Sequence, residues 1–341
     1  MNEKKKIFFK KKILIYGLGK TGISSYHFLK KYNDLNLFDD NKITNKKYPK
    51  KFFLSISKIK KIKFDYILIS PGINIDKCKL RKYLKKNLQK IITDLDVFYC
   101  NNYNNRIIAI TGTNGKSTTA YLTYLILKKQ NKDARLCGNI GNPILLEKKI
   151  SKKTIFVVEV SSYQIEYSKF FKANFAIILN ISPDHLERHN SMKNYIDAKF
   201  KLIKNQSKGG FAFINEKDKY LKSRTKKQKI LSKIIKVSLK KNDKFKNKIN
   251  NIYFSTKGNQ ENLSFIFHII KKLKLKNNHT IETINNFRGL KYRQEIIYKN
   301  KNITFINDSK ATSFASTINI LKSFNKVFWL VGGLAKIGDK F

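Results

Sequence analysis

The residues best suited to chemistry stand in one short stretch, Gly112-Thr-Asn-Gly-Lys-Ser117. An apolar run at residues 107–110 precedes it, and an amphipathic segment to about residue 129 follows it. Strand, glycine loop and helix form the layout of a phosphate-binding loop, in which backbone N–H groups and the helix N-terminus hold phosphate oxygens. In that layout Lys116 reaches the β and γ phosphates of ATP, and the Ser117 hydroxyl binds Mg²⁺. Ile110 stands where the full pattern has its first glycine, so the motif is one glycine short.

Two further apolar runs end in polar residues that suit the same site. Residues 154–160 read as a buried strand with Glu159 near its end, and residues 175–179 lead into Asn-Ile-Ser-Pro-Asp-His185. The carboxyl ends of parallel strands meet at one edge of a sheet, so we expect Glu159 and His185 close to the phosphate loop. Burying a carboxylate within an apolar strand costs free energy unless a metal ion or another cation lies beside it. A salt-bridged core glutamate is the alternative for Glu159, and an ordinary surface or core histidine is the alternative for His185.

The amino-terminal region carries a second glycine loop. A strand at residues 12–16 runs into Gly17-Leu-Gly-Lys-Thr-Gly22, a helix follows, and a strand at residues 35–38 ends at Asp39 and Asp40. Taken alone this is the dinucleotide fingerprint, with an acid placed for a ribose, and it favours an NAD-dependent oxidoreductase. Another strand, at residues 64–70, ends in a turn that contains Gly72, where open α/β sheets place ligands.

Composition limits the classes of protein that remain. The chain has 341 residues, a formal net charge of +49 and only seven arginines, and its lysines are spread over the whole length. This pattern indicates a compositional bias and no nucleic-acid patch, although the charge attracts anionic substrates. Three cysteines without paired spacing favour a reduced, cytoplasmic protein, and the apolar run near the amino terminus is too short for a signal peptide or a membrane span.

These patterns predict an α/β protein in three parts. Residues 1–94 form a Rossmann-like domain, and residues 95–299 form a P-loop ATPase-like domain with a parallel sheet. Residues 300–341 begin an incomplete Rossmann-like domain, with strands at 303–306 and 327–331, because two strands and a helix fall short of a usual domain. We also expect a helix at residues 263–273 after a loop that contains Asn262, a helix at residues 192–204 that carries Lys199, and a loop that presents Arg293.

Together the motifs resemble those of the Mur ligases, and within that family those of the D-glutamate-adding branch. The resemblance runs from Gly17 to the last residues, and the shortened phosphate loop is itself the family's form. It rests on Gly-Leu-Gly-Lys-Thr-Gly, Ser-Pro-Gly-Ile, Thr-Gly-Thr-Asn-Gly-Lys-Ser-Thr, Gly-Asn-Ile-Gly, Glu-Val-Ser-Ser-Tyr-Gln, Asn-Ile-Ser-Pro-Asp-His, Asp-Ala-Lys and Asn-Asp-Ser-Lys-Ala-Thr. The last of these, at residues 307–312, most favours the D-glutamate branch.

The resemblance implies roles for individual residues. It places ATP on Gly112, Thr113, Asn114, Gly115, Lys116, Ser117, Thr118, Asn262, Arg293 and Asp308. It places the UDP-linked substrate on Lys20, Thr21, Asp39, Asp40, Gly72, Asn139, Ser161 and Gln164, so that the first glycine loop holds UDP and not NAD. It places the amino-acid substrate near Lys310, Thr312 and Lys336.

The resemblance also implies a reaction. ATP phosphorylates the carboxylate of UDP-N-acetylmuramoyl-L-alanine, and the amine of D-glutamate attacks the acyl phosphate. Lys116, Glu159, His185 and Lys199 are the implied catalytic residues, with Ser117 and Glu159 on one Mg²⁺ and Glu159, His185 and Lys199 on a second. A cationic lysine cannot bind a metal, and the family's matching lysine is carbamylated, which turns it into an anion. We expect Lys199 to be modified in the same way.

Two departures from the family pattern bear on activity. The family usually has histidine before the arginine that matches Arg293, and this chain has Tyr292. The third domain also stops early, so we expect a fragment or a truncated product with weak D-glutamate binding and an exposed apolar face. We expect a cytoplasmic monomer with small-molecule substrates and no nucleic-acid or membrane partner. The alternatives are another ligase of the superfamily, such as one that extends folate, a nucleotide-binding protein without turnover, and the oxidoreductase.

Overall fold

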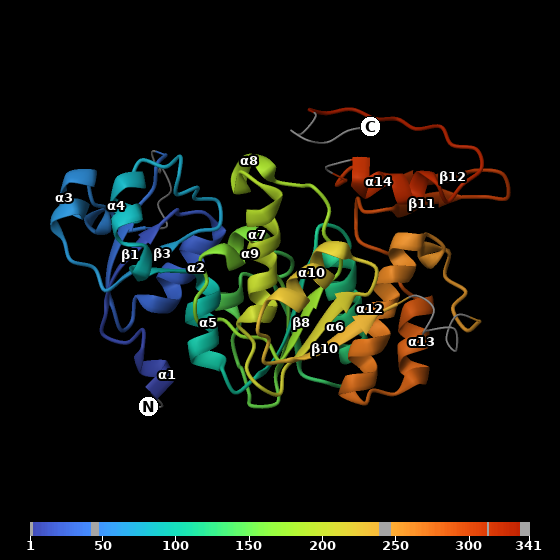
Figure 1. Ribbon diagram of the computed structural model, residues 1–341, viewed down its shortest axis with the longest axis horizontal. Coiled ribbons are helices and arrows are strands. Elements are labelled where there is room, and N and C mark those ends of the chain that lie inside the picture. Colours follow the sequence, from blue (N-terminus) through green and yellow to red (C-terminus); the bar gives the residue numbers. More distant parts are fainter. Residues whose placement is uncertain (1–2, 42–47, 239–246, 312–313, 335–341) are drawn as a thin grey trace.

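The computed structural model describes residues 3–41, 48–238, 247–311 and 314–334, and Figure 1 shows their arrangement. Two parallel sheets form its framework, with strand orders β2-β1-β3-β4 and β10-β9-β8-β5-β7-β6. The strands of the first sheet are β1 (Lys12–Tyr16), β2 (Asp34–Phe38), β3 (Tyr66–Ile69) and β4 (Ile91–Ile92). The strands of the second are β5 (Arg106–Thr111), β6 (Ala134–Gly138), β7 (Ile155–Glu159), β8 (Phe175–Ile178), β9 (Phe211–Asn215) and β10 (Lys233–Val237).

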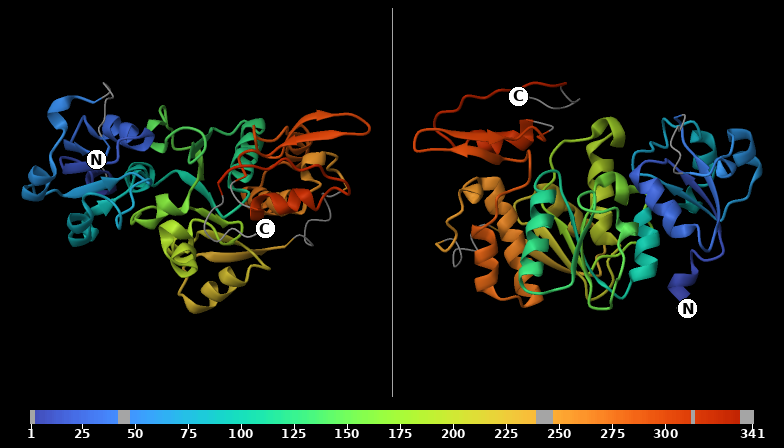
Figure 2. Two further views of the ribbon diagram at one scale, coloured as in Figure 1. Left: turned by 90° about the horizontal axis from the view of Figure 1, so that it is seen from above. Right: turned by 180° about the vertical axis from the view of Figure 1, so that it is seen from behind.

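Helices cover both sheets and connect their strands (Figure 2). Around the first sheet lie α1 (Glu3–Lys6), α2 (Lys20–Leu29), α3 (Ile56–Lys61) and α4 (Arg81–Lys86), and α5 (Asp94–Asn102) leads to the second sheet. Around the second sheet lie α6 (Lys116–Lys129), α7 (Ser162–Glu166), α8 (Leu186–His189), α9 (Met192–Lys204), α10 (Lys219–Lys227), α12 (Lys257–Leu273) and α13 (Asn277–Asn285). Helices α12 and α13 both contact α6, which itself contacts β5, β6 and β7.

The apolar runs form strands because both faces of each sheet are covered. All five residues of β7 are buried, as are the last five of β5, which is the pattern of a strand packed on two sides. One apolar cluster extends from Ile13 and Ile15 of β1 through Leu95 and Phe98 of α5 to Val158 of β7. Helix α5 therefore joins the two sheets through a shared core.

The order of the second sheet puts a topological switch point beside β5. From β5 the chain passes to β6 and β7 on one side, and then to β8, β9 and β10 on the other. Crevices at the carboxyl ends of strands on either side of such a point are where open α/β sheets bind ligands. The phosphate loop follows β5 at this point.

The carboxyl-terminal part differs from its predicted form. Strands β11 (Glu295–Lys299) and β12 (Thr304–Asn307) form an antiparallel pair, and α14 (Phe314–Leu321) follows and contacts α12. The predicted boundary after residue 299 falls inside this hairpin, so we propose that the boundary lies ahead of β11. The predicted strand at residues 327–331 is wrong. No neighbouring strand among the described residues satisfies its backbone, and the side chains of Phe328 and Leu330 are fully exposed.

Helix α12 also begins earlier than predicted. Asn262 was predicted to lie in a loop before a helix at residues 263–273, but the helix starts at Lys257 and includes Asn262. Thr256 is its N-cap, and the Thr256 hydroxyl accepts a hydrogen bond from the backbone N–H of Asn259. The cap stabilises a first turn whose glycine and asparagines suggested a loop. No described helix is long and apolar enough to cross a membrane.

Candidate active site

The phosphate loop lies between the end of β5 and the start of α6. Gly115 is the N-cap of α6 with φ +82°, and a Cβ atom there would lie 2.2 Å from Oδ1 of Asn262. Glycine is therefore required both by the left-handed backbone and by the close approach of α12. The carbonyl and side-chain oxygens of Asn180 accept hydrogen bonds from the backbone N–H groups of Thr113 (3.0 Å) and Asn114 (2.8 Å), which hold the loop in place.

Two lysines meet at one carbonyl oxygen of this loop. The Lys116 ammonium donates to the carbonyl oxygens of Gly112 (2.9 Å) and Thr113 (2.7 Å), and Nζ of Lys199 donates to the same Gly112 oxygen (2.8 Å). Lys199 comes from α9 and its side chain is buried against the ring of Tyr195. Burial, and next the nearby charge of Lys116, lower the pKa of Lys199 well below its usual range. Burial therefore favours the uncharged form of the Lys199 amine.

Glu159 is the last residue of β7 and pairs in register with Ile110 of β5. Its side chain is fully buried, and Oε1 accepts a hydrogen bond of 2.8 Å from the Asn139 side chain. The second oxygen, Oε2, has no hydrogen-bond partner among the described residues. A buried carboxylate oxygen without a donor suits a cation, so this side chain fits the predicted metal site.

His185 follows β8 and starts α8 with a left-handed backbone, φ +55°. Its two ring nitrogens face carboxylates, Nε2 at 3.3 Å from Asp184 and Nδ1 at 3.5 Å from Glu187. Asp184 and Glu159 both lie close enough to Lys199 to affect the pKa of that lysine. Asp184 stands directly before His185 in the Asn-Ile-Ser-Pro-Asp-His motif, but the motif by itself indicated no role for it.

The predicted metal ligands do not form a ready cluster of standard ligands. Within the part of the chain that the structure describes, no three His, Cys, Asp or Glu side chains are grouped for a metal ion. The predicted set contains two such residues, Glu159 and His185, and otherwise relies on the Ser117 hydroxyl and on a modified Lys199. Ser117 lies buried in the first turn of α6.

A polar network joins the phosphate loop to the carboxyl-terminal hairpin. Asn262 donates to Asn259 (3.3 Å), whose own amide donates to the Gln294 side chain (2.9 Å). The backbone N–H of Gln294 in turn donates to Asp308 (3.1 Å). Burial raises the pKa of Asp308 to about 6, although that hydrogen bond and the nearby Arg293 oppose the rise. The network therefore connects the predicted ATP residues Asn262 and Asp308 to each other.

Tyr253 adds a second connection that the sequence analysis did not identify. Its hydroxyl lies 3.2 Å from the Thr118 hydroxyl in α6 and 3.4 Å from the backbone carbonyl of Arg293. Its ring also fills the space beside Gly289, where a Cβ atom would approach within 2.7 Å. No periodicity marks Tyr253, because it stands in a short 3-10 turn at Ile252–Phe254.

A cavity of about 790 Å³ opens at the carboxyl ends of the first sheet and reaches the second. Seven of the eight residues predicted to bind the UDP-linked substrate line it, namely Lys20, Thr21, Asp39, Asp40, Gly72, Asn139 and Gln164. The eighth, Ser161, caps α7 and forms a capping box with Gln164. The cavity therefore continues from the first glycine loop to Asn139, which is the hydrogen-bond partner of Glu159.

Within this cavity the two predicted acids already have partners. Oδ2 of Asp39 accepts a 2.7 Å hydrogen bond from the backbone N–H of Leu18 and so holds the glycine loop. Oδ1 of Asp40 accepts a 2.6 Å hydrogen bond from the Tyr16 hydroxyl. Both carboxylates therefore shape the cavity wall.

The predicted amino-acid residues are only partly described. The backbone N–H of Lys310 donates to the Tyr292 carbonyl (3.0 Å), and the Lys310 ammonium lies 5.9 Å from the centre of the Tyr292 ring. Thr312 and Lys336 lie outside the described residues. Tyr292 itself has a left-handed backbone, φ +65°, and is half exposed.

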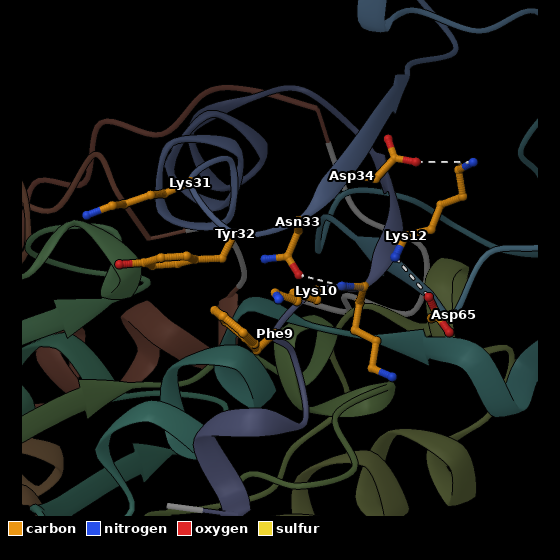
Figure 3. Close-up of a pocket in the computed structure, with 9 residues that line it drawn as sticks. Phe9, Lys10, Lys12, Lys31, Tyr32, Asn33, Asp34 and Asp65 are labelled. Atoms are coloured by element: carbon orange, nitrogen blue, oxygen red, sulfur yellow. Dashed lines mark hydrogen bonds and ion pairs between the residues drawn. The ribbon is translucent and has the colours of Figure 1, made fainter. Parts of the chain in front are cut away.

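A second cavity, of about 680 Å³, lies at the opposite end of β1 (Figure 3). Four lysines line it, together with Phe9, Tyr32, Asn33, Asp34 and Asp65. The ammonium of Lys12 pairs with Asp34 at 3.1 Å, and the backbone N–H of Lys12 donates to Asp65 at 2.8 Å, so acidic groups balance part of its charge. None of the predicted site residues lies here.

Several known proteins are similar in sequence to this chain over most of its length. Residues 110–286 match the Mur ligase middle domain. The UDP-N-acetylmuramoylalanine–D-glutamate ligase of Rickettsia bellii is 33% identical over 353 residues, which cover 96% of this chain and 78% of that protein. The protein of the same name from Rickettsia prowazekii is 35% identical over 350 residues, with 96% and 78% covered.

A solved structure shares the fold. The UDP-N-acetylmuramate-alanine ligase of Thermotoga maritima superposes with a TM-score of 0.52 at 20% identity, over 92% of this chain and 77% of that one. This likeness concerns the fold alone, and it agrees with the predicted α/β class.

Proposed function

The chain belongs to the Mur ligase family, and we propose that it uses ATP to join D-glutamate to UDP-N-acetylmuramoyl-L-alanine. The relatives from both Rickettsia species carry the name of this activity and cover nearly the whole chain. We further propose that the reaction is a step of peptidoglycan precursor synthesis in the cytoplasm. We propose that the first glycine loop binds UDP and not a dinucleotide, because the family assignment accounts for both glycine loops at once.

The observation that carries the proposal is the position of Asn139. Its side chain lines the substrate cavity and donates to Glu159, which is adjacent in register to the strand that bears the phosphate loop. A UDP-linked substrate anchored at the first glycine loop would therefore extend toward the place where the γ-phosphate of ATP would lie. Such an arrangement supports transfer of phosphate between two ligands held in line.

The chain's own groups suit the first step, which is attack of the substrate carboxylate on the γ-phosphorus. A bond forms between the carboxylate oxygen and phosphorus, and the bond from phosphorus to the ADP oxygen breaks. Both reactants are anions, so the step needs positive charge and oriented N–H groups. Lys116, the loop backbone and the N-terminus of α6 would supply them.

In the second step the D-glutamate amine attacks the acyl carbon of the acyl phosphate. The amine loses a proton, the tetrahedral intermediate collapses, and phosphate leaves as the amide bond forms. We assign Lys310, Thr312 and Lys336 to the amino acid, following the family pattern. Lys310 lies in the segment that the Asn259–Gln294–Asp308 network ties to the phosphate loop.

The residues present fit the Mg²⁺ that the family implies. Oε2 of Glu159 is buried and lacks a donor, and we propose Ser117 and Glu159 for one ion and Glu159, His185 and Lys199 for a second. Mg²⁺ would neutralise charge on the phosphate oxygens.

Lys199 would serve as a ligand only after carbamylation. A neutral amine can add to CO₂, with a new N–C bond and loss of one proton, and the product is an anionic carbamate. Burial lowers the pKa of Lys199 and so favours the uncharged amine that the modification needs, which supports this proposal. Its contact with Gly112 places the new anion beside the phosphate loop.

ADP release from this chain tests the proposal. The assay contains ATP, Mg²⁺ and UDP-N-acetylmuramoyl-L-alanine, with and without D-glutamate. We expect release that depends on D-glutamate and is lost in Glu159→Ala. ATP and UDP-substrate binding without turnover would support the nucleotide-binding alternative, and turnover with a folate substrate instead would favour the other branch of the superfamily. Amide formation that survives Glu159→Ala would overturn the metal assignment.

A further inference from the structure

One buried acid in the substrate cavity has no role in the mechanism above. Asp94 is the first residue of α5, and it lines the cavity beside the loop at Gly138 and Asn139. Its side chain is almost completely buried, at 2% exposure. Oδ1 accepts a hydrogen bond of 3.1 Å from the backbone N–H of Leu95, and the backbone N–H of Asp94 itself also lies near the carboxylate. Among the described residues no side chain donates a hydrogen bond to Oδ2.

Asp96, two residues along the same helix, is bonded very differently. The two Asp96 oxygens accept six hydrogen bonds, from Ser168, Thr93 and the backbone of residues 93 and 169–171. Asp96 is therefore fully engaged in structure and has no capacity for a ligand. Asp94 instead lines the cavity, and no described side chain donates a hydrogen bond to its Oδ2, so a ligand in the cavity can reach this oxygen.

We propose that Asp94 binds the sugar–peptide half of the UDP-linked substrate, with the carboxylic acid at Oδ2 donating a hydrogen bond to a ligand oxygen. The proposal rests on the function proposed above. Asp94 lines the cavity together with Gly138 and Asn139, and Gly138 of β6 pairs in register with Glu159 of β7, so we place Asp94 at the half of the ligand nearer the phosphate loop. The uridine end would lie at the other end of the cavity, around Lys20 and Thr21.

The protonation state of Asp94 fits a donor. Burial raises the pKa of Asp94 to about 7, and the neighbouring Asp96 charge adds to the rise, while hydrogen bonds from the helix backbone oppose it. Below that pH the group is a neutral acid that can donate to an oxygen. Above it the group becomes an anion that accepts only and repels a negatively charged ligand. Substrate binding should therefore weaken as the pH rises through about 7.

Other titratable groups also face Asp94 or the cavity. They are Asp96 on α5, Cys137 on β6, Glu147 after the turn at Ile144–Leu146, and Lys20, Asp39, Asp40, Lys77 and Cys78 on the cavity wall. A variant that removes only the Asp94 titration separates its effect from theirs. Asp94→Asn does so, because the amide keeps a donor at the same place and stays neutral at every pH.

Calorimetric titration of the full chain with UDP-N-acetylmuramoyl-L-alanine at about pH 6 and about pH 8 tests the proposal. The wild-type dissociation constant should rise about tenfold, as a group with a pKa near 7 passes from mostly protonated to mostly ionised. Asp94→Asn should bind at both pH values about as tightly as the wild type does at the lower one. Asp94→Leu, which has no donor, should bind about tenfold more weakly at both. Asp34→Asn, the same change at the opposite end of the sheet, should keep the wild-type pH response.

Each outcome decides the question. A wild-type affinity that does not change with pH, or an Asp94→Asn variant that keeps the wild-type pH response, overturns the role of Asp94 and leaves the proposed function intact. A wild type that binds no UDP-linked substrate overturns the proposed function and this inference together. ATP affinity and the thermal midpoint show whether each variant is folded, and the comparison of Asp94→Asn with the wild type holds even if Asp94→Leu does not fold.

Discussion

Glu159→Gln should make the chain more stable without Mg²⁺ and less stable than the wild type with it. Glu159 is fully buried, with one oxygen bonded to Asn139 and the other without a donor among the described residues. Glutamine keeps the size of the side chain and the bond from Asn139 but removes the charge. Without a cation, the substitution therefore removes the free-energy cost of a buried carboxylate with only one bonded oxygen. With Mg²⁺ present, it removes a proposed ligand of the ion.

The size of the effect follows from the missing hydrogen bond. A buried polar group without a partner costs about 1–3 kcal/mol, and more when it is charged. A neutral amide in the same place costs less, so we expect a gain of about 1 kcal/mol in the free energy of unfolding. For a domain of this size that gain corresponds to a rise of about 2–4 °C in the thermal midpoint. ATP and Mg²⁺ at about 100 times the dissociation constant should stabilise the wild type by about 2.7 kcal/mol, and the variant by much less.

Thermal unfolding with and without ATP and Mg²⁺ measures both halves of this prediction. Glu166→Gln is the matched control, because Glu166 pairs with the buried Arg188 at 3.1 Å and its loss should lower stability in both conditions. If Glu159→Gln is less stable than the wild type without Mg²⁺, the carboxylate has a partner and the reasoning is wrong. If ATP and Mg²⁺ stabilise both proteins equally, Glu159 is not a metal ligand.

Three further predictions concern the two glycine loops and the buried lysine. Gly22→Ala should lower the free energy of unfolding by about 3 kcal/mol, because a Cβ atom there would lie 2.1 Å from the backbone carbonyl oxygen of Gly17. Gly19→Ala is the control, since a Cβ atom there would have nothing within 4 Å, and it should change the free energy of unfolding by less than about 0.5 kcal/mol. Chemical denaturation measures both. Equal losses of stability in both variants would contradict the close approach of Gly22 to the Gly17 carbonyl. Tyr253→Phe should weaken ATP binding by a few fold, since it removes the hydroxyl that meets Thr118, and an unchanged ATP affinity in calorimetry would exclude that role. With ¹³C-labelled bicarbonate, the wild type should show a carbamate signal by NMR that Lys199→Arg lacks; persistence of the signal in the variant would place the modification elsewhere.

The elements that local patterns define were predicted well. Strand β1 and helix α9 have the predicted bounds, and β5, β7 and β8 differ from their predicted bounds by a residue or two. A buried strand in a parallel sheet reads as a short continuous apolar run, and a glycine loop marks its end. The family motifs supplied the rest of the candidate residues.

The errors arose where a neighbour in space decides the outcome. Asn262 lies within a helix because the Thr256 cap outweighs the local bias of glycine and asparagine toward loops. Residues 327–331 have the apolar composition of a strand, but a strand forms only where another strand pairs with its backbone. Strand β11 was missed because its partner, β12, defines it.

The sequence by itself determined the two glycine loops, the buried parallel strands and the chemical types available at their ends, because these depend on residues close together in the chain. Only the tertiary structure placed Lys199 on the carbonyl of Gly112, 87 positions away, and left Oε2 of Glu159 without a donor among the described residues. It also set Asp94 in the wall of the cavity at the carboxyl ends of the first sheet, where no described side chain donates to its Oδ2, although nothing around it in the sequence distinguishes it from Asp96. Burial and hydrogen-bond partners depend on which elements pack together, and these two properties decide what a side chain can do.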